Sequence, residues 1–202
     1  MCWVGFIVRV CTIIHVPEFG KPYGGLKPQL EQIVSTTAAT PSADTLSAIA
    51  AFRELVATLT AEIAGKPLDA TLDTWLNAHH GVASASYQQL KAACVQGAAD
   101  GWLCKYEGGG LRYGRIFKPA EDLHGFSVDV VDMKDVAGPH HVHPEGEIDL
   151  IMPLDEGALF DGRPAGWMVT PAGSAHRPTV SQGRALVLYL LPNGRIEFTA
   201  AA

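Results

Sequence analysis

Two kinds of hydrophobic periodicity divide the chain near its middle. Between residues 44 and 107, apolar side chains recur every three or four positions, which is the spacing of helices with one buried face. From residue 108 onward, apolar residues alternate with polar ones in short runs bounded by Gly, Pro, Asp or Asn, as in β-strands. The pattern therefore predicts an α+β fold in which helices precede strands.

Three helices are expected in the first region, each with apolar residues gathered on one face. They are a helix capped by Asp44 and stopped by Gly65 and Pro67, a second helix over residues 69–81, and a third over residues 86–102. Gly108, Gly109 and Gly110 then break the helical pattern.

The second region contains many short predicted strands at even spacing, at residues 111–117, 126–132, 147–154, 158–160, 166–170, 185–191 and 195–199. Such a series is typical of a sandwich or a barrel. The expected organisation is a leader or linker with little regular structure over residues 1–43, a helical region over 44–107 and a β-barrel over 108–202.

Composition narrows the possible partners. The chain has 202 residues, of which 48% are hydrophobic and 18% charged, and its formal net charge is -6. No run of Lys and Arg occurs, whereas binding to nucleic acid requires clustered positive charge. Nucleic acid is therefore not an expected partner, and the composition suits a soluble globular protein of one domain, or of one domain with a helical appendage.

The cysteines and residues 1–15 indicate in which cellular compartment the protein is expected. The four cysteines form no CxxC pair, so a thiolate zinc site is not expected, and a reduced, cytoplasmic setting fits best. Residues 1–15 are apolar but are interrupted by Arg9 and are too short to span a bilayer. They also lack the basic start and small-residue cleavage site of a signal peptide, so neither secretion nor a membrane anchor is expected.

The chemistry lies in the segment GPHHVHPEGE, which begins at Gly138. His141 and His143 are two residues apart and so share a face if this segment is a strand. The Pro-Glu-Gly that follows can turn the chain and return Glu147 to that face. Further on, PAGSAH can turn and bring His176 onto the neighbouring strand.

Three imidazoles and one carboxylate suit one divalent metal ion, such as zinc, iron, manganese, nickel or cobalt. Four protein ligands leave one or two positions open on a five- or six-coordinate ion, and a catalytic metal needs such an open position. The sequence alone does not choose among these metals, because the same ligand set accepts several of them.

The pattern HxHxxxE followed by PxGxxH resembles the two signature motifs of the cupin superfamily, over roughly residues 111–199. The resemblance implies a small jelly-roll barrel, a double-stranded β-helix, with the metal held by His141, His143, Glu147 and His176. Two positions depart from the motifs: Asp135 stands where a Gly usually opens the first motif, and no Asn follows His176. Neither position is a ligand, so the departures concern loop geometry.

The whole chain, with helices before the barrel, is similar to the para-hydroxylaminobenzoate lyase family of nitroarene degradation. That resemblance implies conversion of 4-hydroxylaminobenzoate to protocatechuate with release of ammonia. In such a reaction Glu147 is a candidate ligand or base. Glu145 and His140 are further candidates for moving protons, with His140 ranked lower because alternation on the strand turns it away.

The substrate carboxylate needs a guanidinium partner. Arg115 is the first candidate because it shares a strand face with Tyr113 and Phe117, and Tyr113 is itself a candidate substrate contact. Arg177, beside an expected metal ligand, is the second candidate cation. Trp167 precedes the second motif on a predicted strand and is a candidate aromatic wall for the ring, although core packing is an equal possibility.

Two other functions remain open from the sequence. A cupin dioxygenase or isomerase could use the same four ligands, and a non-enzymatic cupin could bind a small molecule without turnover. By analogy with other cupins, a homodimer is the expected assembly.

Overall fold

The computed structural model describes residues 41–199, in which three helices precede an antiparallel β-region. The helices are α1 (Ala43–Ile63), α2 (Ala70–His79) and α3 (Ala85–Ala99). The strands are β1 (Tyr106–Gly108), β2 (Leu111–Phe117), β3 (Phe126–Ala137), β4 (His141–His143), β5 (Glu147–Pro153), β6 (Leu159–Phe160), β7 (Gly166–Thr170), β8 (Ser174–His176), β9 (Thr179–Pro192) and β10 (Glu197–Phe198). The leader expected over residues 1–43 lies almost entirely outside the described residues. Within residues 41–199, no helix is long and apolar enough to cross a membrane.

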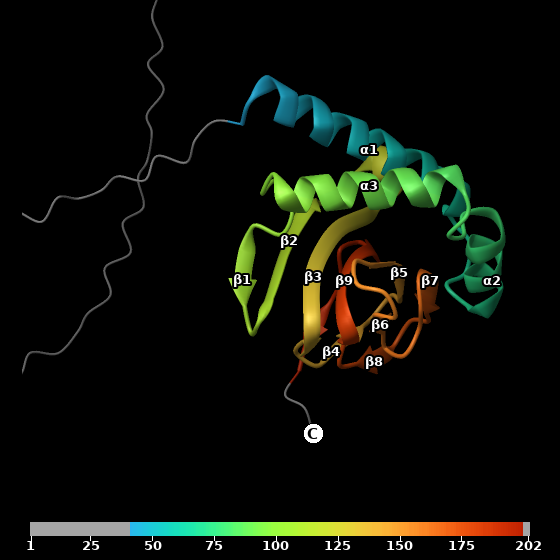
Figure 1. Cartoon of the computed structure of the whole chain (residues 1–202). Coiled ribbons are helices and arrows are strands. Elements are labelled where there is room, and N and C mark those ends of the chain that lie inside the picture. The colour runs from blue at the N-terminus through green and yellow to red at the C-terminus, as the bar shows by residue number, and fades with distance from the viewer. Residues whose placement is uncertain (1–40, 200–202) are drawn as a thin grey trace, which may run out of the picture. The chain divides into compact units, whose positions relative to one another are not determined.

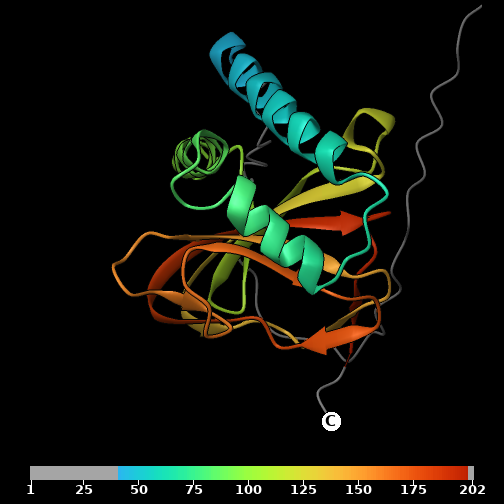
Figure 2. The ribbon, with the colours of Figure 1, turned by 90° about the vertical axis from the view of Figure 1, so that its right-hand side faces the viewer.

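The strands form two antiparallel sheets. The large sheet has the order β1-β2-β3-β9-β5-β7, with β6 also paired to β9, and the small sheet has the order β10-β4-β8. In Figure 1, α1 and α3 lie across one side of the large sheet and α2 lies beside β7. Figure 2 looks onto α2 from the side and shows it lying over the strands. The expected α+β order, with helices before an antiparallel β-region, is confirmed.

Helix boundaries follow local chemistry and correct two expectations. The first helix is capped by Ser42, whose hydroxyl accepts a hydrogen bond from the Thr45 N–H, while Asp44 lies inside the first turn. Asp44 was therefore the wrong cap, although its charge still favours the helix N-terminus. The third helix ends at Ala99 and not at residue 102, because Gly101 adopts a φ of 75° and turns the chain out of the helix.

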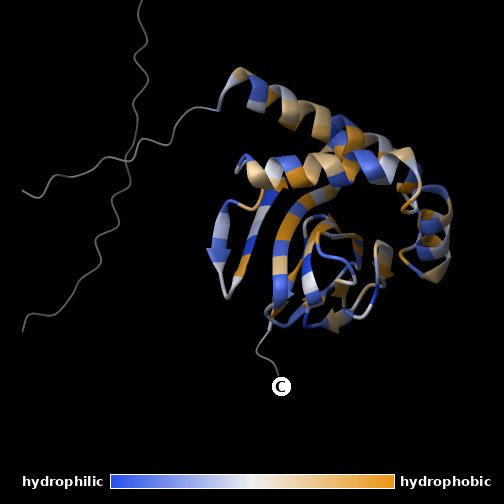
Figure 3. Cartoon of the chain, in the orientation of Figure 1, coloured by the Kyte–Doolittle hydropathy of each residue, from blue (hydrophilic) through white to orange (hydrophobic). Residues whose placement is uncertain are grey.

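Both faces of the large sheet are buried. Successive residues along each strand point to opposite faces, so the buried residues form two separate clusters. On one face, residues such as Val130, Leu150 and Leu188 pack beneath the helices. On the other face, residues such as Met133, Ile151 and Val187 form a second cluster inside the β-region. Figure 3 shows the resulting bands of apolar and polar residues along β3. The face turned away from the helices is the one that carries the polar groups described below.

Helix α2 covers the outer edge of the large sheet at β7. The Asn77 side chain donates to the backbone carbonyl of Trp167 at 2.9 Å and accepts from its N–H at 2.9 Å, as a neighbouring strand would. Asp73 accepts from the Val169 N–H at 3.1 Å, and Arg163 also donates to the Trp167 carbonyl at 3.1 Å. Two side chains of one helix thus satisfy backbone groups that an exposed edge strand leaves open.

Replacing Asn77 with Ala should lower the free energy of unfolding by about 2 kcal/mol, because it leaves backbone groups of β7 without partners. Urea denaturation followed by circular dichroism measures the change. Thr74→Ala is the matched control, since Thr74 is on the same helix and its hydroxyl bonds to the Ala70 carbonyl of that helix. The Thr74 variant should stay within about 0.5 kcal/mol of the parent. Equal stability of the two variants would show that Asn77 does not support the sheet edge.

Candidate metal centre

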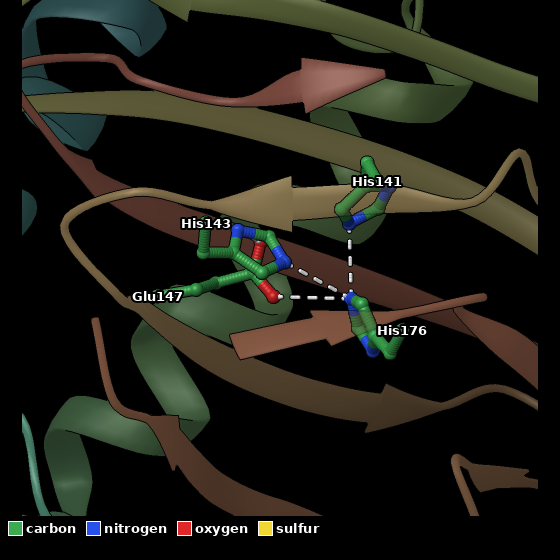
Figure 4. A group of neighbouring side chains, drawn as sticks. All are labelled: His141, His143, Glu147 and His176. Atoms are coloured by element: carbon green, nitrogen blue, oxygen red, sulfur yellow. Dashed lines mark hydrogen bonds and ion pairs between the residues drawn. The ribbon is translucent and has the colours of Figure 1, made fainter. Parts of the chain in front are cut away.

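The small sheet brings the three motif histidines together. His141 and His143 lie on β4 with their side chains on one face, and the antiparallel register of β4 with β8 sets His141 directly opposite His176. Glu147 begins β5 in the large sheet, after the turn that follows His143. Figure 4 shows the four side chains, from three strands, pointing toward one another.

A glycine makes the turn between His143 and Glu147 possible. Gly146 has a φ of 87°, and a Cβ there would lie 2.8 Å from the Leu68 side chain and 2.8 Å from the Thr170 carbonyl oxygen. Any larger residue would strain the backbone and collide with both neighbours. The turn that returns Glu147 to the site is therefore packed against the segment that joins α1 to α2.

The candidate ligand atoms of the four residues lie within 4.8 Å of one another. The Nε2 atom of His176 is 2.9 Å from that of His141 and 3.1 Å from that of His143. It lies 3.6 Å from Oε1 of Glu147. Metal–nitrogen bonds of roughly 2.0–2.1 Å place adjacent ligands of one ion about 3 Å apart, so this spacing fits a shared metal ion.

Hydrogen bonds fix which ring nitrogens face the centre. Nδ1 of His141 donates to the Pro139 carbonyl at 3.1 Å, and Nδ1 of His176 donates to the Asp161 carboxylate at 2.6 Å. Because each neutral imidazole carries one proton, both Nε2 atoms then present lone pairs to the centre. This carboxylate–histidine arrangement is the usual support for a metal-binding imidazole.

Burial leaves the cluster with unsatisfied polar atoms. Among the described residues, both carboxylate oxygens of Glu147 and Nδ1 of His143 are buried without a hydrogen-bond partner. Burial lowers the pKa of His141 to about 4 and the pKa of His143 to about 3, so both are neutral imidazoles at pH 7. Neutral imidazoles offer lone pairs but no positive charge to balance an ionised carboxylate of Glu147. A divalent metal ion bound to all four side chains would supply that positive charge.

A second buried carboxyl group adjoins the first. Asp149 lies two residues beyond Glu147 on the same face of β5, is fully buried, and has no hydrogen-bond partner for either oxygen within residues 41–199. Burial raises the pKa of both carboxyl groups well above their usual values. Without a cation nearby, this shift favours the protonated, neutral form of the two acids, and a positive ion in the centre would favour their ionised form.

Helices packed on a two-sheet antiparallel β-region, with a cluster of three histidines and one glutamate, match the arrangement expected from the cupin-like motifs and form a candidate metal site. The sequence model of the family described as 4-hydroxylaminobenzoate lyase matches residues 54–198. The chain belongs to this family and is therefore an enzyme of the lyase class.

Two relatives bear the same description. The 4-hydroxylaminobenzoate lyase of Pseudomonas putida is 32% identical over 155 residues, which cover 68% of this chain and 88% of the relative. The 4-hydroxylaminobenzoate lyase of Nocardioides sp. (strain LMS-CY) is 34% identical over 146 residues, which cover 68% and 86%. Both alignments span nearly the whole relative.

Solved structures give only partial matches. Oxalate oxidase in complex with the substrate analogue glycolate is 23% identical with a TM-score of 0.35, over 46% of this chain and 57% of that one. An RmlC-like cupin protein from Ralstonia eutropha JMP134 is 11% identical with a TM-score of 0.34, over 46% and 62%. Similarity at this level carries no information about activity.

Both candidate proton-transfer residues beside the motif lie outside the cluster. His140 faces away, as the alternation predicted, and its Nδ1 lies 2.6 Å from the Thr199 hydroxyl. Glu145 accepts hydrogen bonds from the Asn193 amide at 2.6 Å and from Arg195 at 3.3 Å. Both residues support the surface turns around the site, and of the candidate catalytic carboxylates only Glu147 is in the cluster.

Trp167 does not form an aromatic wall. Its ring is buried against the helices on the opposite face of the large sheet, and its Nε1 donates to the His80 carbonyl at 2.7 Å. The reason is strand register: Met168 points into the β-region, so Trp167 beside it points out. Of the two possibilities open from the sequence, the structure places Trp167 in core packing.

The other candidate substrate residues border one cavity of about 860 Å³ that also reaches His141. Tyr113, Arg115 and Arg177 all line it. Arg115 is already paired, since its Nε lies 3.0 Å from both oxygens of Asp129. Arg177 forms only a long contact of 3.5 Å with the Gly138 carbonyl and no ion pair within residues 41–199. The structure thus makes Arg177 the more available cation.

Three polar residues near the site were missed from the sequence. Asp161, which orients His176, lies in a turn whose Asp-Gly sequence gives no sign of such a role. Asp129 and Tyr189 are paired across β3 and β9 and both line the cavity. Asp129 follows the same alternation as the apolar residues on β3, so an acid at an inward position was the available signal.

Asp161→Asn should weaken metal binding by about 10–100-fold, because it removes the charge that orients His176 while keeping an oxygen for the Thr179 N–H. Competition with a fluorescent chelator measures the metal affinity. Glu156→Gln is the matched control, since Glu156 is exposed in a nearby turn and should leave the affinity unchanged. An unchanged affinity in the Asp161 variant would contradict the assigned support.

Proposed function

We propose that the chain is a metal-dependent cupin lyase that converts 4-hydroxylaminobenzoate and water to protocatechuate and ammonia. The observation that carries the proposal is a cluster of three histidines and one glutamate at the wall of a cavity that also presents the Arg177 guanidinium. The family and both relatives have the same activity in their descriptions. The metal is a divalent ion whose identity is open, because zinc, iron, manganese, nickel and cobalt all suit this ligand set.

A metal ion held by His141, His143, Glu147 and His176 would supply a Lewis acid for the hydroxylamino oxygen and so ease cleavage of the N–O bond. The remaining steps depend on residues of the chain. Arg177 binds the substrate carboxylate, and Tyr189 offers a hydroxyl donor within the same cavity. The apolar residues of the cavity wall exclude water from the aromatic ring.

Arg115 supports the cavity wall and does not bind the substrate carboxylate in this proposal. Its guanidinium is neutralised by Asp129 and also donates to the Gly194 carbonyl at 3.1 Å. The pair fixes the wall of the cavity next to Tyr189 without adding net charge to it. Arg177 is then the available cation among the described residues of the wall, and it defines one orientation for a substrate that carries one carboxylate.

The metal-loaded full chain should form protocatechuate and ammonia in equal amounts from 4-hydroxylaminobenzoate, with and without oxygen. Chromatography for protocatechuate and an enzymatic ammonia assay measure the two products. Removal of the metal by chelation should abolish turnover, and Glu147→Gln should reduce it by at least about 100-fold because it removes a charged ligand.

Each alternative function gives a different result in that assay. Turnover that requires oxygen would indicate a cupin dioxygenase, and binding without turnover would indicate a small-molecule-binding cupin. Either result, or product formation that survives complete metal removal, would overturn the proposal. The cytoplasmic location and the homodimer expected from the sequence remain predictions.

Arg177→Gln should raise KM by about tenfold or more while changing kcat little, because it removes a charge-assisted bond to the substrate carboxylate. Steady-state kinetics measure both constants. Lys134→Gln is the control, since it removes one positive charge from an exposed position of β3 that does not line the cavity. If KM rises in Arg115→Gln and not in Arg177→Gln, the carboxylate binds at Arg115 instead.

A further inference from the structure

The cavity beside His141 is large for a substrate with one ring. Its volume is about 860 Å³, toward the upper end of the roughly 300–1,000 Å³ usual for cavities that hold drug-sized ligands. An apolar cavity of about 150 Å³ is already enough to hold benzene. A benzoate ring with one small substituent therefore fills only a fraction of the space.

The spare volume lies toward the β1–β2 hairpin. Of the four cluster residues only His141 lines the cavity, whose wall extends from there to Gly108 and Gly109 at the tip of the hairpin. The hairpin flanks β3 at the free edge of the large sheet (Figure 1). The two glycines carry no side chains, so the hairpin leaves this end of the cavity open.

The lining favours an apolar extension of an anionic ligand. Apart from Arg177 and the neutralised pair of Arg115 and Asp129, the wall is mainly apolar, with Leu111, Val131, Met133, Ile196 and Phe198. A second charged group on the ligand would lose its hydration here without a partner. A second aromatic ring would instead remove apolar surface from water on both sides.

We propose that the site takes aromatic hydroxylamines larger than one ring, namely two-ring carboxylates such as a hydroxylaminonaphthoate, with the second ring beneath the β1–β2 hairpin. This inference rests on the proposed function for the chemistry at the cluster. The inference extends the proposed function by naming a larger class of substrate, because the volume of the cavity, and not the cluster, limits the size of the ligand.

Binding of non-reactive analogues tests the inference separately from catalysis. Isothermal titration of the full, metal-loaded chain compares 4-aminobenzoate with 4-amino-1-naphthoate, which keeps the amino and carboxylate groups para to each other on one ring; both lack the cleavable N–O bond. Burial of the second ring should make the naphthoate bind about tenfold tighter. Equal or weaker binding of the naphthoate would overturn the inference, whatever the activity of the protein.

A substitution in the hairpin tests where the second ring lies. Gly108 has an ordinary φ, and a Cβ there would meet only the Tyr113 ring and hydroxyl, at 3.8 Å, so a side chain fits without strain. Gly108→Leu should reduce the preference for the naphthoate over the benzoate by at least about tenfold, because the leucine occupies the space of the second ring.

Glu107→Leu is the matched control for the hairpin. Gly108 pairs with Leu111, which faces the cavity, whereas Glu107 pairs with Arg112 on the other face of the hairpin. The Glu107 variant adds the same side chain outside the cavity and should leave the preference unchanged. A preference that survives in Gly108→Leu would show that the second ring does not lie under the hairpin, which contradicts the inference.

Kinetics with the two reactive hydroxylamines separate the two proposals. If the chain converts 4-hydroxylamino-1-naphthoate with a kcat/KM within about tenfold of that for 4-hydroxylaminobenzoate, both proposals are supported. Turnover of the benzoate with rejection of the naphthoate by more than about 1,000-fold overturns the inference alone. Tight binding of the naphthoate analogue without turnover of either hydroxylamine overturns the proposed function and leaves the larger ligand class supported.

Discussion

The burial of two acidic side chains, Glu147 and Asp149, inside the β-region is the constraint on which the site depends. Ionised carboxylates removed from water are costly unless positive charge lies beside them. The His141 and His143 imidazoles near them are neutral, and burial holds them so. The fold can accept these acids because the opposite face of β5 places Ile148 and Leu150 in the core beneath the helices. Apolar burial on one face of a strand thus offsets the cost of polar burial on the other.

The pairing register of β4 with β8 brings the histidines of the two sequence motifs together. The separation of two residues between His141 and His143 requires only that β4 be a strand, which explains why their convergence on one face was predictable from sequence. The opposition of His141 and His176 depends on the pairing of β4 with β8, and the turn residues Pro171 and Gly173 give a local signal for it. The fold class followed from periodicity in the same way, since helices and strands have different periods.

Other features could not be predicted from the sequence because they depend on contacts between distant residues. Asp161 contacts His176 only after β6 and β8 are in place. The inward position of Asp129 and the outward position of Trp167 depend on which face of the sheet the helices cover. Propensity alone favoured Asp44 as the first cap because it lies nearest the apolar pattern, whereas the bond from the Thr45 N–H selects Ser42. Short strands such as β1, whose three residues are all exposed, have no buried face and leave no periodic trace.

The close packing at Gly146 has a consequence for how the protein can change over evolutionary time. The turn that carries the chain from His143 to Glu147 rests on Leu68, which lies between α1 and α2. An insertion or a bulkier residue in that interhelical connection would displace Glu147 from the cluster rather than merely alter the surface. The helices and the strands that carry the cluster must therefore diverge in concert, and a β-region separated from its helices would not keep the same geometry among the four clustered side chains.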